Sequence, residues 1–112
     1  MIGSHVVIEC DTVIGDRVSI QSGAYITRYC ILEDDVFIGP GVVTTNDPFL
    51  GRRKYQENIG CTIRRGAAIG ANSTILPGVD IGASATVGAG SVVTRNVPPG
   101  QTWWGNPAVR HR

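Results

Sequence analysis

The stretch IRRGAAIGANSTILPGVDIGASATVGAGSVVTRNVP, residues 63–98, decides the fold because its residue types repeat every six positions. Each hexad begins with an aliphatic residue: Ile63, Ile69, Ile75, Ile81, Val87 and Val93. The fifth position of each hexad is small or β-branched. A period of six fits neither an α-helix nor one continuous alternating strand, whose periods are about 3.6 and 2. It indicates short strands joined by tight turns, with the first and fifth positions pointing inward.

The same register is present in the first part of the chain. Its aliphatic first positions are Ile2, Ile8, Ile14, Ile20, Ile26, Leu32 and Ile38. The hexads therefore cover residues 2–43 and 63–98, with an interruption at residues 44–62 and a tail at residues 99–112. If three hexads make one triangular coil, residues 18 apart stack in parallel ladders about 4.8 Å apart. Thirteen hexads predict a single all-β domain, residues 1–112, of a little over four triangular coils interrupted by one long loop.

The composition is that of one small globular domain. The chain has 112 residues, of which 42% are hydrophobic and 17% are charged, and this balance excludes a disordered chain. A net charge of +1 gives no electrostatic case for binding nucleic acid or an anionic membrane. No apolar run approaches the roughly 20 residues that span a bilayer, and the start MIGSHVVIEC lacks the regions of a signal peptide. We therefore expect a cytoplasmic protein that binds neither nucleic acid nor membrane.

The cysteines and histidines do not indicate a metal site. Cys10, Cys30 and Cys61 are odd in number and widely spaced, so they match neither a zinc pattern nor a disulfide framework. Reduced cysteines are the expected state. His5 and His111 are too few and too distant for a zinc enzyme with about three histidine ligands.

The hexads resemble the hexapeptide-repeat acyltransferases, and the segment IGANSTILPGVDIGASATVGAGSVVTRNVPPG, followed by GNPAVR, resembles the C-terminal signature of members that use coenzyme A. The resemblance implies a left-handed parallel β-helix, since the six-residue period does not determine the hand. It also implies a homotrimer, which agrees with an interior too narrow to stabilise one chain. The segment TND, residues 45–47, resembles the subgroup that N-acetylates amino sugars on nucleotide carriers.

The resemblance also implies acetyl-CoA as the acyl donor. In the family, small residues leave backbone groups at the coil edge open to the pantetheine arm, and a Thr-basic pair contacts the cofactor. These roles fall on Ala67, Ala71, Ala89, Thr94 and Arg95. Arg95 would meet a phosphate of the coenzyme. The family usually has a basic residue directly after GNPA, whereas this chain has Val109 and then Arg110. Turn geometry alone is the other explanation of the small residues.

The interruption at residues 44–62 is too long for a simple turn. It is either a functional loop or a tolerated insertion, and we expect it to carry function. Hexapeptide enzymes that acetylate hydroxyl groups generally use a loop histidine as general base, and this loop has none. A neutral amine attacks through its own lone pair and needs mainly positioning. In the resembled subgroup an asparagine at this point lies in the catalytic region. We carry that role to Asn46, with Asp47 as proton acceptor or amine anchor. Both would otherwise form an Asx-turn before Pro48.

Other residues near the loop have two interpretations each. A basic cluster is either a solvated surface or a phosphate site: Arg52, Arg53, Lys54, Arg64 and Arg65. Tyr55 either stacks on a nucleobase or anchors the loop. His5 is either a surface histidine or a base brought in across an interface. Of Trp103 and Trp104, one is expected to close the end of the core and the other to pack at an interface or stack on an adenine.

The sequence therefore predicts an acetyl-CoA-dependent N-acetyltransferase acting on the amine of a nucleotide-linked amino sugar. One alternative is an O-acetyltransferase or a xenobiotic acetyltransferase on the same scaffold. Another is a degenerate, non-catalytic hexapeptide-repeat protein. The chain starts inside a repeat, and coils upstream of this point would contribute to a sugar-nucleotide pocket.

Overall fold

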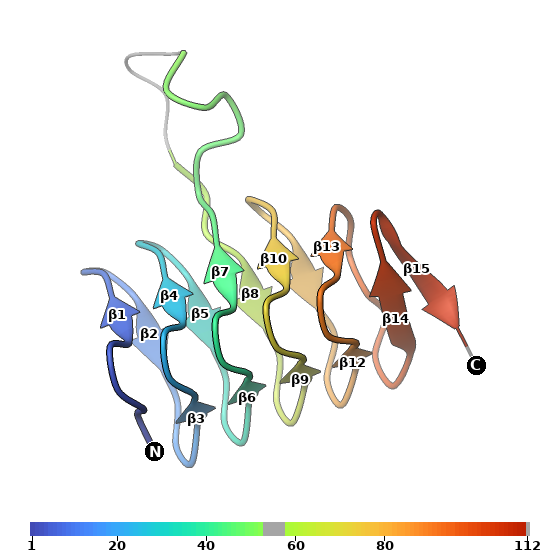
Figure 1. The fold of residues 1–112 in the computed structure, drawn as a ribbon, viewed down its shortest axis with the longest axis horizontal. Helices are drawn as coiled ribbons and strands as arrows, with labels where there is room; N and C mark the ends of the chain where they lie inside the picture. Colours follow the sequence, from blue (N-terminus) through green and yellow to red (C-terminus); the bar gives the residue numbers. More distant parts are fainter. Residues whose placement is uncertain (53–57, 112) are drawn as a thin grey trace.

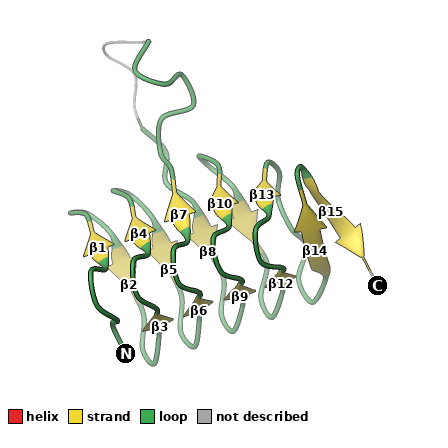
Figure 2. Ribbon diagram, viewed as in Figure 1, coloured by secondary structure: helices red, strands yellow, loops and turns green. Residues whose placement is uncertain are grey.

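Two-residue strands follow one another every six residues and wind into a triangular column of parallel strands (Figure 1). The computed structural model describes residues 1–52 and 58–111 of the chain. This part of the chain contains no helix, so no helix in it is able to cross a membrane (Figure 2). The strands are β1 (Val7–Ile8), β2 (Val13–Ile14), β3 (Ser19–Ile20), β4 (Tyr25–Ile26), β5 (Ile31–Leu32), β6 (Phe37–Ile38), β7 (Val43–Thr44), β8 (Thr62–Ile63), β9 (Ala68–Ile69), β10 (Thr74–Ile75), β11 (Asp80–Ile81), β12 (Thr86–Val87), β13 (Val92–Val93), β14 (Thr102–Gly105) and β15 (Ala108–His111). The predicted all-β, left-handed parallel β-helix is confirmed.

Three parallel sheets form the faces of the column. Face one contains β1, β4, β7, β10 and β13, and face two contains β2, β5, β8 and β11. Face three contains β3, β6, β9, β12 and β14, with β15 added antiparallel at its end. The column has about five coils, slightly more than predicted. The excess arises outside the thirteen hexad strands, because Ile2 bridges to Ile20 at the start of face three and β14, in the expected tail 99–112, extends the same face at its other end.

The long loop enters and leaves without disturbing the register of the strands. Before the loop, Val7 of β1 pairs with Tyr25 of β4, which is the partner expected from three hexads per coil. Across the loop, Ile31 of β5 pairs with Thr62 of β8, so the partners are further apart in sequence by the net length that the loop adds. Strand β7 ends and strand β8 begins inside the expected interruption 44–62, so the regular column continues slightly further on both sides.

The first and fifth positions of the hexads form the core, as their residue types predict. The buried aliphatic side chains at the first position are Ile20, Ile26, Leu32, Ile38, Ile63, Ile69, Ile75, Ile81, Val87 and Val93. The same position is more exposed at the N-terminal end of the column, 53% at Ile2 and 38% at Ile8. At the other end Trp103 is buried in the core cluster, which is the place expected for one of the two tryptophans.

Two hexad positions shape the corners, for different reasons. The fourth position adopts the left-handed conformation, with φ of 56° at His5 and 73° at Tyr29, which costs energy in residues other than glycine. The second position lies against the next coil instead. A Cβ atom at Gly70 would lie 2.5 Å from the nitrogen of Ala89. Glycine at position 70 is therefore needed for close stacking of the coils and not for its φ.

One polar side chain occupies a first position, where the other hexads have aliphatic residues. Thr44 is fully buried at the end of β7. Its hydroxyl accepts a hydrogen bond from the nitrogen of Thr27 (2.8 Å) and donates one to the oxygen of Tyr25 (3.1 Å). These bonds fasten β7 to the coil below at the point where the loop leaves the column.

Thr44→Val is expected to lower the free energy of unfolding by about 1–3 kcal/mol, although it makes the core more uniformly aliphatic. Valine has nearly the same shape but leaves the buried N–H of Thr27 without its acceptor. Thr44→Ser is the control, because it keeps the hydroxyl and removes only a methyl group, worth about 1 kcal/mol or less. Denaturant unfolding of the three proteins measures the differences. A Thr44→Val protein as stable as the wild type would contradict this account.

Candidate functional site

The loop leaves the column at the corner between faces one and two, and it stands away from the column between β7 and β8 (Figure 1). At its base lies a hollow of about 420 Å³, which we call the loop cleft. The cleft is lined by Thr45, Asp47, Pro48, Leu50, Leu76, Pro77 and Thr94. Asp47 and Thr94, two residues that the sequence singled out separately, therefore lie in the same cleft.

The carboxylate of Asp47 is held in place by the backbone of the loop. Its Oδ1 atom accepts a hydrogen bond from the nitrogen of Phe49 (2.9 Å), and its Oδ2 atom accepts one from the nitrogen of Gly51 (2.6 Å). Asp47 thus makes the Asx-type turn that was the alternative interpretation of this residue. The two interpretations are compatible, because an ionised carboxylate is able to accept hydrogen bonds from backbone N–H groups and to attract a cation at the same time.

Asn46 points in a different direction from Asp47. Its side-chain Nδ2 donates a hydrogen bond to the oxygen of Arg28 on the coil below (3.3 Å), and its backbone oxygen accepts one from the nitrogen of Ile59 (2.9 Å). Asn46 therefore links the outgoing limb of the loop to the returning limb and to the column. It does not line the loop cleft, so the structure separates the two residues expected to act together.

The five residues expected to contact acetyl-CoA lie at three different corners. Thr94 and Arg95 lie at the corner between faces one and two, where the loop leaves. Ala71 and Ala89 lie on successive coils at the corner between faces three and one. Ala67 lies at the remaining corner, is fully buried, and its backbone groups bond within the column. Its side chain therefore offers no surface to a ligand, whereas the other four residues belong to two separate edges of one chain.

Arg95 lies over the end of the core. Its guanidinium carbon is 5.1 Å from the centroid of the buried Trp103 ring. Among the described residues no carboxylate forms an ion pair with Arg95, so its charge is not neutralised there. Trp104 is 42% exposed and stacks on His111, with ring centroids 3.5 Å apart and planes at 6°. The two tryptophans thus have different roles, as expected, with Trp103 inside the column and Trp104 on its surface.

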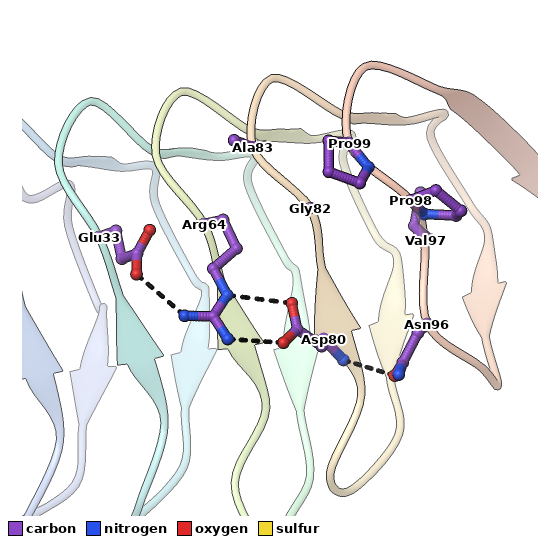
Figure 3. A pocket seen from close by; sticks show the side chains of 9 residues that line it. All are labelled: Glu33, Arg64, Asp80, Gly82, Ala83, Asn96, Val97, Pro98 and Pro99. Atoms are coloured by element: carbon purple, nitrogen blue, oxygen red, sulfur yellow. Dashed lines mark hydrogen bonds and ion pairs between the residues drawn. The ribbon is translucent and has the colours of Figure 1, made fainter.

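Arg64 does not belong to a basic cluster at the loop. It extends from β8 across face two, where it donates two hydrogen bonds to Asp80 (2.7 and 3.1 Å) and one to Glu33 (3.1 Å) (Figure 3). These carboxylates raise its pKa, so it stays charged, and they neutralise that charge. The adjoining hollow of about 480 Å³ also contains Pro98 and Pro99. Because Arg64 is already paired on both sides, the interpretation of this residue as a phosphate contact is not supported.

The two other described cations of the expected basic cluster, Arg52 and Arg65, lie in different parts of the structure. Arg65 lies at the corner between faces two and three, 3.6 Å from a carboxylate oxygen of Asp35. Arg52 is exposed in the loop. Arg53, Lys54 and Tyr55 lie outside the described residues.

The ion pairs of Asp35 with Arg17 and Arg65 make the free energy of unfolding depend on pH. Hydrogen bonds from Arg17 (2.8 and 3.3 Å), together with the charges of Arg17 and Arg65, hold the pKa of Asp35 below its usual range. A carboxyl whose pKa is lower in the folded state adds stability above its unfolded pKa, and this stability is lost as the pH falls through the folded value. We expect Asp35→Asn to reduce the loss of stability between about pH 6 and about pH 2. Unfolding midpoints in urea across this range measure it, with Asp16→Asn, another exposed carboxylate, as control. Equal slopes for wild type and Asp35→Asn would contradict the prediction.

Neither histidine lies in the loop cleft. His5 is at the corner between faces three and one on the first coil, a different corner from the one that the loop leaves. His111 is in β15 and stacks on Trp104. The apolar walls of the cleft, Leu50 and Leu76, were not predicted. A signal for Leu76 was present, because it lies at the second position of a hexad, where glycine is otherwise common.

The repeats match a known protein family. The model of the bacterial transferase hexapeptide family (six repeats) matches residues 11–46 and 60–95, which is more than half of the chain and lies on both sides of the loop. The chain belongs to the bacterial transferase hexapeptide family. No curated protein sequence matches the chain at a significant level.

Solved structures of acetyltransferases have the same fold as this hexapeptide-family chain. Serine acetyltransferase from Neisseria gonorrhoeae is 30% identical with a TM-score of 0.85, over 96% of this chain and 41% of that one. A histidine variant of GDP-perosamine N-acetyltransferase from Caulobacter crescentus, in complex with CoA and GDP-perosamine, is 30% identical with a TM-score of 0.80, over 96% of this chain and 45% of that one. A hexapeptide-repeat acetyltransferase from Vibrio cholerae is 29% identical with a TM-score of 0.75, over 98% and 71%. The chain thus spans less than half the length of the first two enzymes.

Proposed function

We propose that the protein transfers an acetyl group from acetyl-CoA to the amine of a nucleotide-linked amino sugar. Membership of a transferase family supports the reaction class. The complex of the perosamine N-acetyltransferase with CoA and GDP-perosamine supports the two substrates. The observation that carries the proposal is the loop cleft, where the Asp47 carboxylate lies among apolar residues and beside Thr94.

The chemistry of the cleft suits an amine acceptor. An amino sugar arrives as an ammonium ion, and the negative charge of the Asp47 carboxylate would bind it at the cleft. When a substrate covers them, the apolar side chains of Leu50, Leu76 and Pro77 would exclude water and strengthen this interaction. Once it has lost one proton, the amine attacks the thioester carbonyl by its own lone pair. Asp47 is the residue in the cleft that is able to take that proton.

The division of the site residues between two corners favours a site made by two copies of the chain. Ala71 and Ala89 lie on one edge of the column, and Asp47 and Thr94 lie on another. In a homotrimer of parallel columns, the first edge of one copy would face the loop corner of the next. Face one is suited to such packing, since it exposes apolar side chains such as Val7 (46%) and Val43 (38%).

Serine O-acetylation is the second candidate function. It is favoured by the TM-score of 0.85 to serine acetyltransferase, against 0.80 for the perosamine enzyme. A hydroxyl acceptor must lose a proton as it attacks a thioester, and this normally requires a histidine. In the part of the chain that the structure describes, neither histidine lines the loop cleft. His5 lies at the same edge as Ala71 and Ala89, but on the first coil, two coils before the strand from which the loop leaves, so the amine acceptor is the better match.

The experiment starts with titration calorimetry of the purified chain with acetyl-CoA, repeated on Arg95→Ala. Micromolar binding that weakens in the variant supports the donor site. Release of free CoA is then followed with nucleotide-linked amino sugars and, in parallel, with L-serine. Turnover with the amino sugars alone is the expected result. Turnover with serine alone would support the second candidate function instead. If the folded protein does not bind acetyl-CoA, the proposal that this chain is an acetyltransferase is wrong.

A further inference from the structure

Two cysteines from distant parts of the sequence lie side by side in the core beneath the loop. The sulfur atoms of Cys30 and Cys61 are 3.5 Å apart, and both side chains are fully buried. Each stands at the fifth position of its hexad, just before Leu32 and Ile63, which are partners in β5 and β8. The cysteines are therefore neighbours on consecutive coils, at the corner where the loop returns to the column.

This arrangement suits a disulfide. Neighbouring parallel strands are about 4.8 Å apart, which lies within the Cα separation that disulfides commonly span, about 4.4–6.8 Å. The sulfur atoms have only to approach from 3.5 Å to a bond length of about 2.05 Å. The pair also favours ionisation of one sulfur over the other. Hydrogen bonding with Cys61 lowers the pKa of Cys30, whereas the same hydrogen bond and burial raise the pKa of Cys61.

We propose that Cys30 and Cys61 form a reversible disulfide when the protein meets a small two-electron thiol oxidant such as hydrogen peroxide. The sulfur of Cys30 attacks one peroxide oxygen, the O–O bond breaks, hydroxide leaves, and Cys30 becomes a sulfenic acid. The sulfur of Cys61 then attacks that of Cys30, so that the S–S bond forms while the S–O bond breaks and a second hydroxide leaves. The two thiols lose two electrons and two protons, and the peroxide becomes two water molecules.

The crosslink changes how the base of the loop is held. The outgoing limb is fastened to the coil below by the hydroxyl of Thr44 and the side-chain amide of Asn46. The returning limb contains Cys61, and the disulfide fastens it covalently to Cys30 on the same coil. In the reduced protein the loop base opens when hydrogen bonds break, whereas in the oxidised protein it opens only after reduction. The pair is thus a modification site that fixes the end of the returning limb covalently to the column at the foot of the loop.

The test counts thiols in the full chain carrying Cys10→Ser, which removes the exposed cysteine from the count. The folded protein is treated with hydrogen peroxide, freed of the oxidant, denatured and alkylated with iodoacetamide. The untreated protein should take up two alkyl groups. The treated protein should take up none and lose the mass of two hydrogen atoms, and dithiothreitol should restore both thiols.

Trypsin gives a second readout that needs no substitution. Arg52 is exposed and lies between the two cysteines in sequence. After cleavage there, the fragments 1–52 and 53–112 should stay joined on a denaturing, non-reducing gel only if the protein was oxidised. Cys30→Ser and Cys61→Ser should each abolish this joining. The proposal is wrong if both thiols remain free under peroxide that fully oxidises Cys10 in the wild type, or if either buried cysteine becomes a sulfinic acid instead.

Discussion

Asp47→Asn is expected to lower kcat/KM for acetyl transfer to an amine acceptor by about 100- to 1,000-fold. A neutral amide neither binds an ammonium ion as an ion pair nor takes a proton from it. Binding of acetyl-CoA, for which we propose Ala71, Ala89 and Arg95 and not the Asp47 carboxylate, should remain nearly unchanged. Steady-state kinetics with a nucleotide-linked amino sugar and calorimetry with acetyl-CoA measure the two effects separately.

The control must separate the charge of Asp47 from its role in the turn. Gly51 donates its N–H to Asp47 and has a φ of 77°, so Gly51→Ala strains the same turn by about 1–2 kcal/mol without touching the carboxylate. Gly51→Ala should lose far less activity than Asp47→Asn. Equal losses in the two variants would reduce Asp47 to a structural residue of the loop.

Leu32→Ala is expected to lower the free energy of unfolding by about 2–5 kcal/mol. Leu32 is fully buried in the middle of the column, between aliphatic side chains of the coils above and below, and truncation leaves a cavity that these coils cannot fill. The neighbouring residue provides a matched control. Ile31 lies on the same strand but is 41% exposed, so Ile31→Ala should cost about 1 kcal/mol or less. Denaturant unfolding measures both, and similar losses in the two variants would mean that the inward and outward positions are misassigned.

The column was predictable because its period is local and repeated many times. A single aliphatic residue, such as Ile20, is weak evidence of burial. The recurrence of aliphatic residues every six positions, up to Val93, identifies the side of each strand that faces inward. The exception, Thr44, could not be recognised as a core residue. Its burial depends on hydrogen bonds to Thr27 and Tyr25, and a repeat pattern contains no information about such partners.

The loop cleft was only partly predictable. Asp47 and Thr94 were singled out separately, yet their presence in one cleft depends on how the loop folds back toward the coils above it. Asn46 was paired with Asp47 because they are adjacent in sequence, whereas its side chain bonds to Arg28 on the coil below. Arg64 was grouped with the cations of the loop for the same reason, although its partners are carboxylates on neighbouring coils of face two.

The pairing of Cys30 with Cys61 was only partly predictable from the sequence. Each cysteine lies just before an aliphatic first position, Leu32 and Ile63. Counting back from these positions, and not along the chain, places the two cysteines at equivalent points of their hexads. The sequence alone does not reveal how much chain the loop adds, and it is this length that places the two hexads on consecutive coils.

The strand partners stay in register on both sides of the loop, although the loop adds residues between them. This corner therefore accepts inserted residues without any change in how the strands of neighbouring coils pair. The length and composition of the loop are free to vary, because the coils above and below it are joined through the pairing of β4, β7 and β10 and not through the loop. Under the proposed function, recognition of the acceptor is thereby uncoupled from construction of the scaffold. Exchanging the residues between Thr45 and Gly60 should transplant a recognition element while the remaining coils keep their positions.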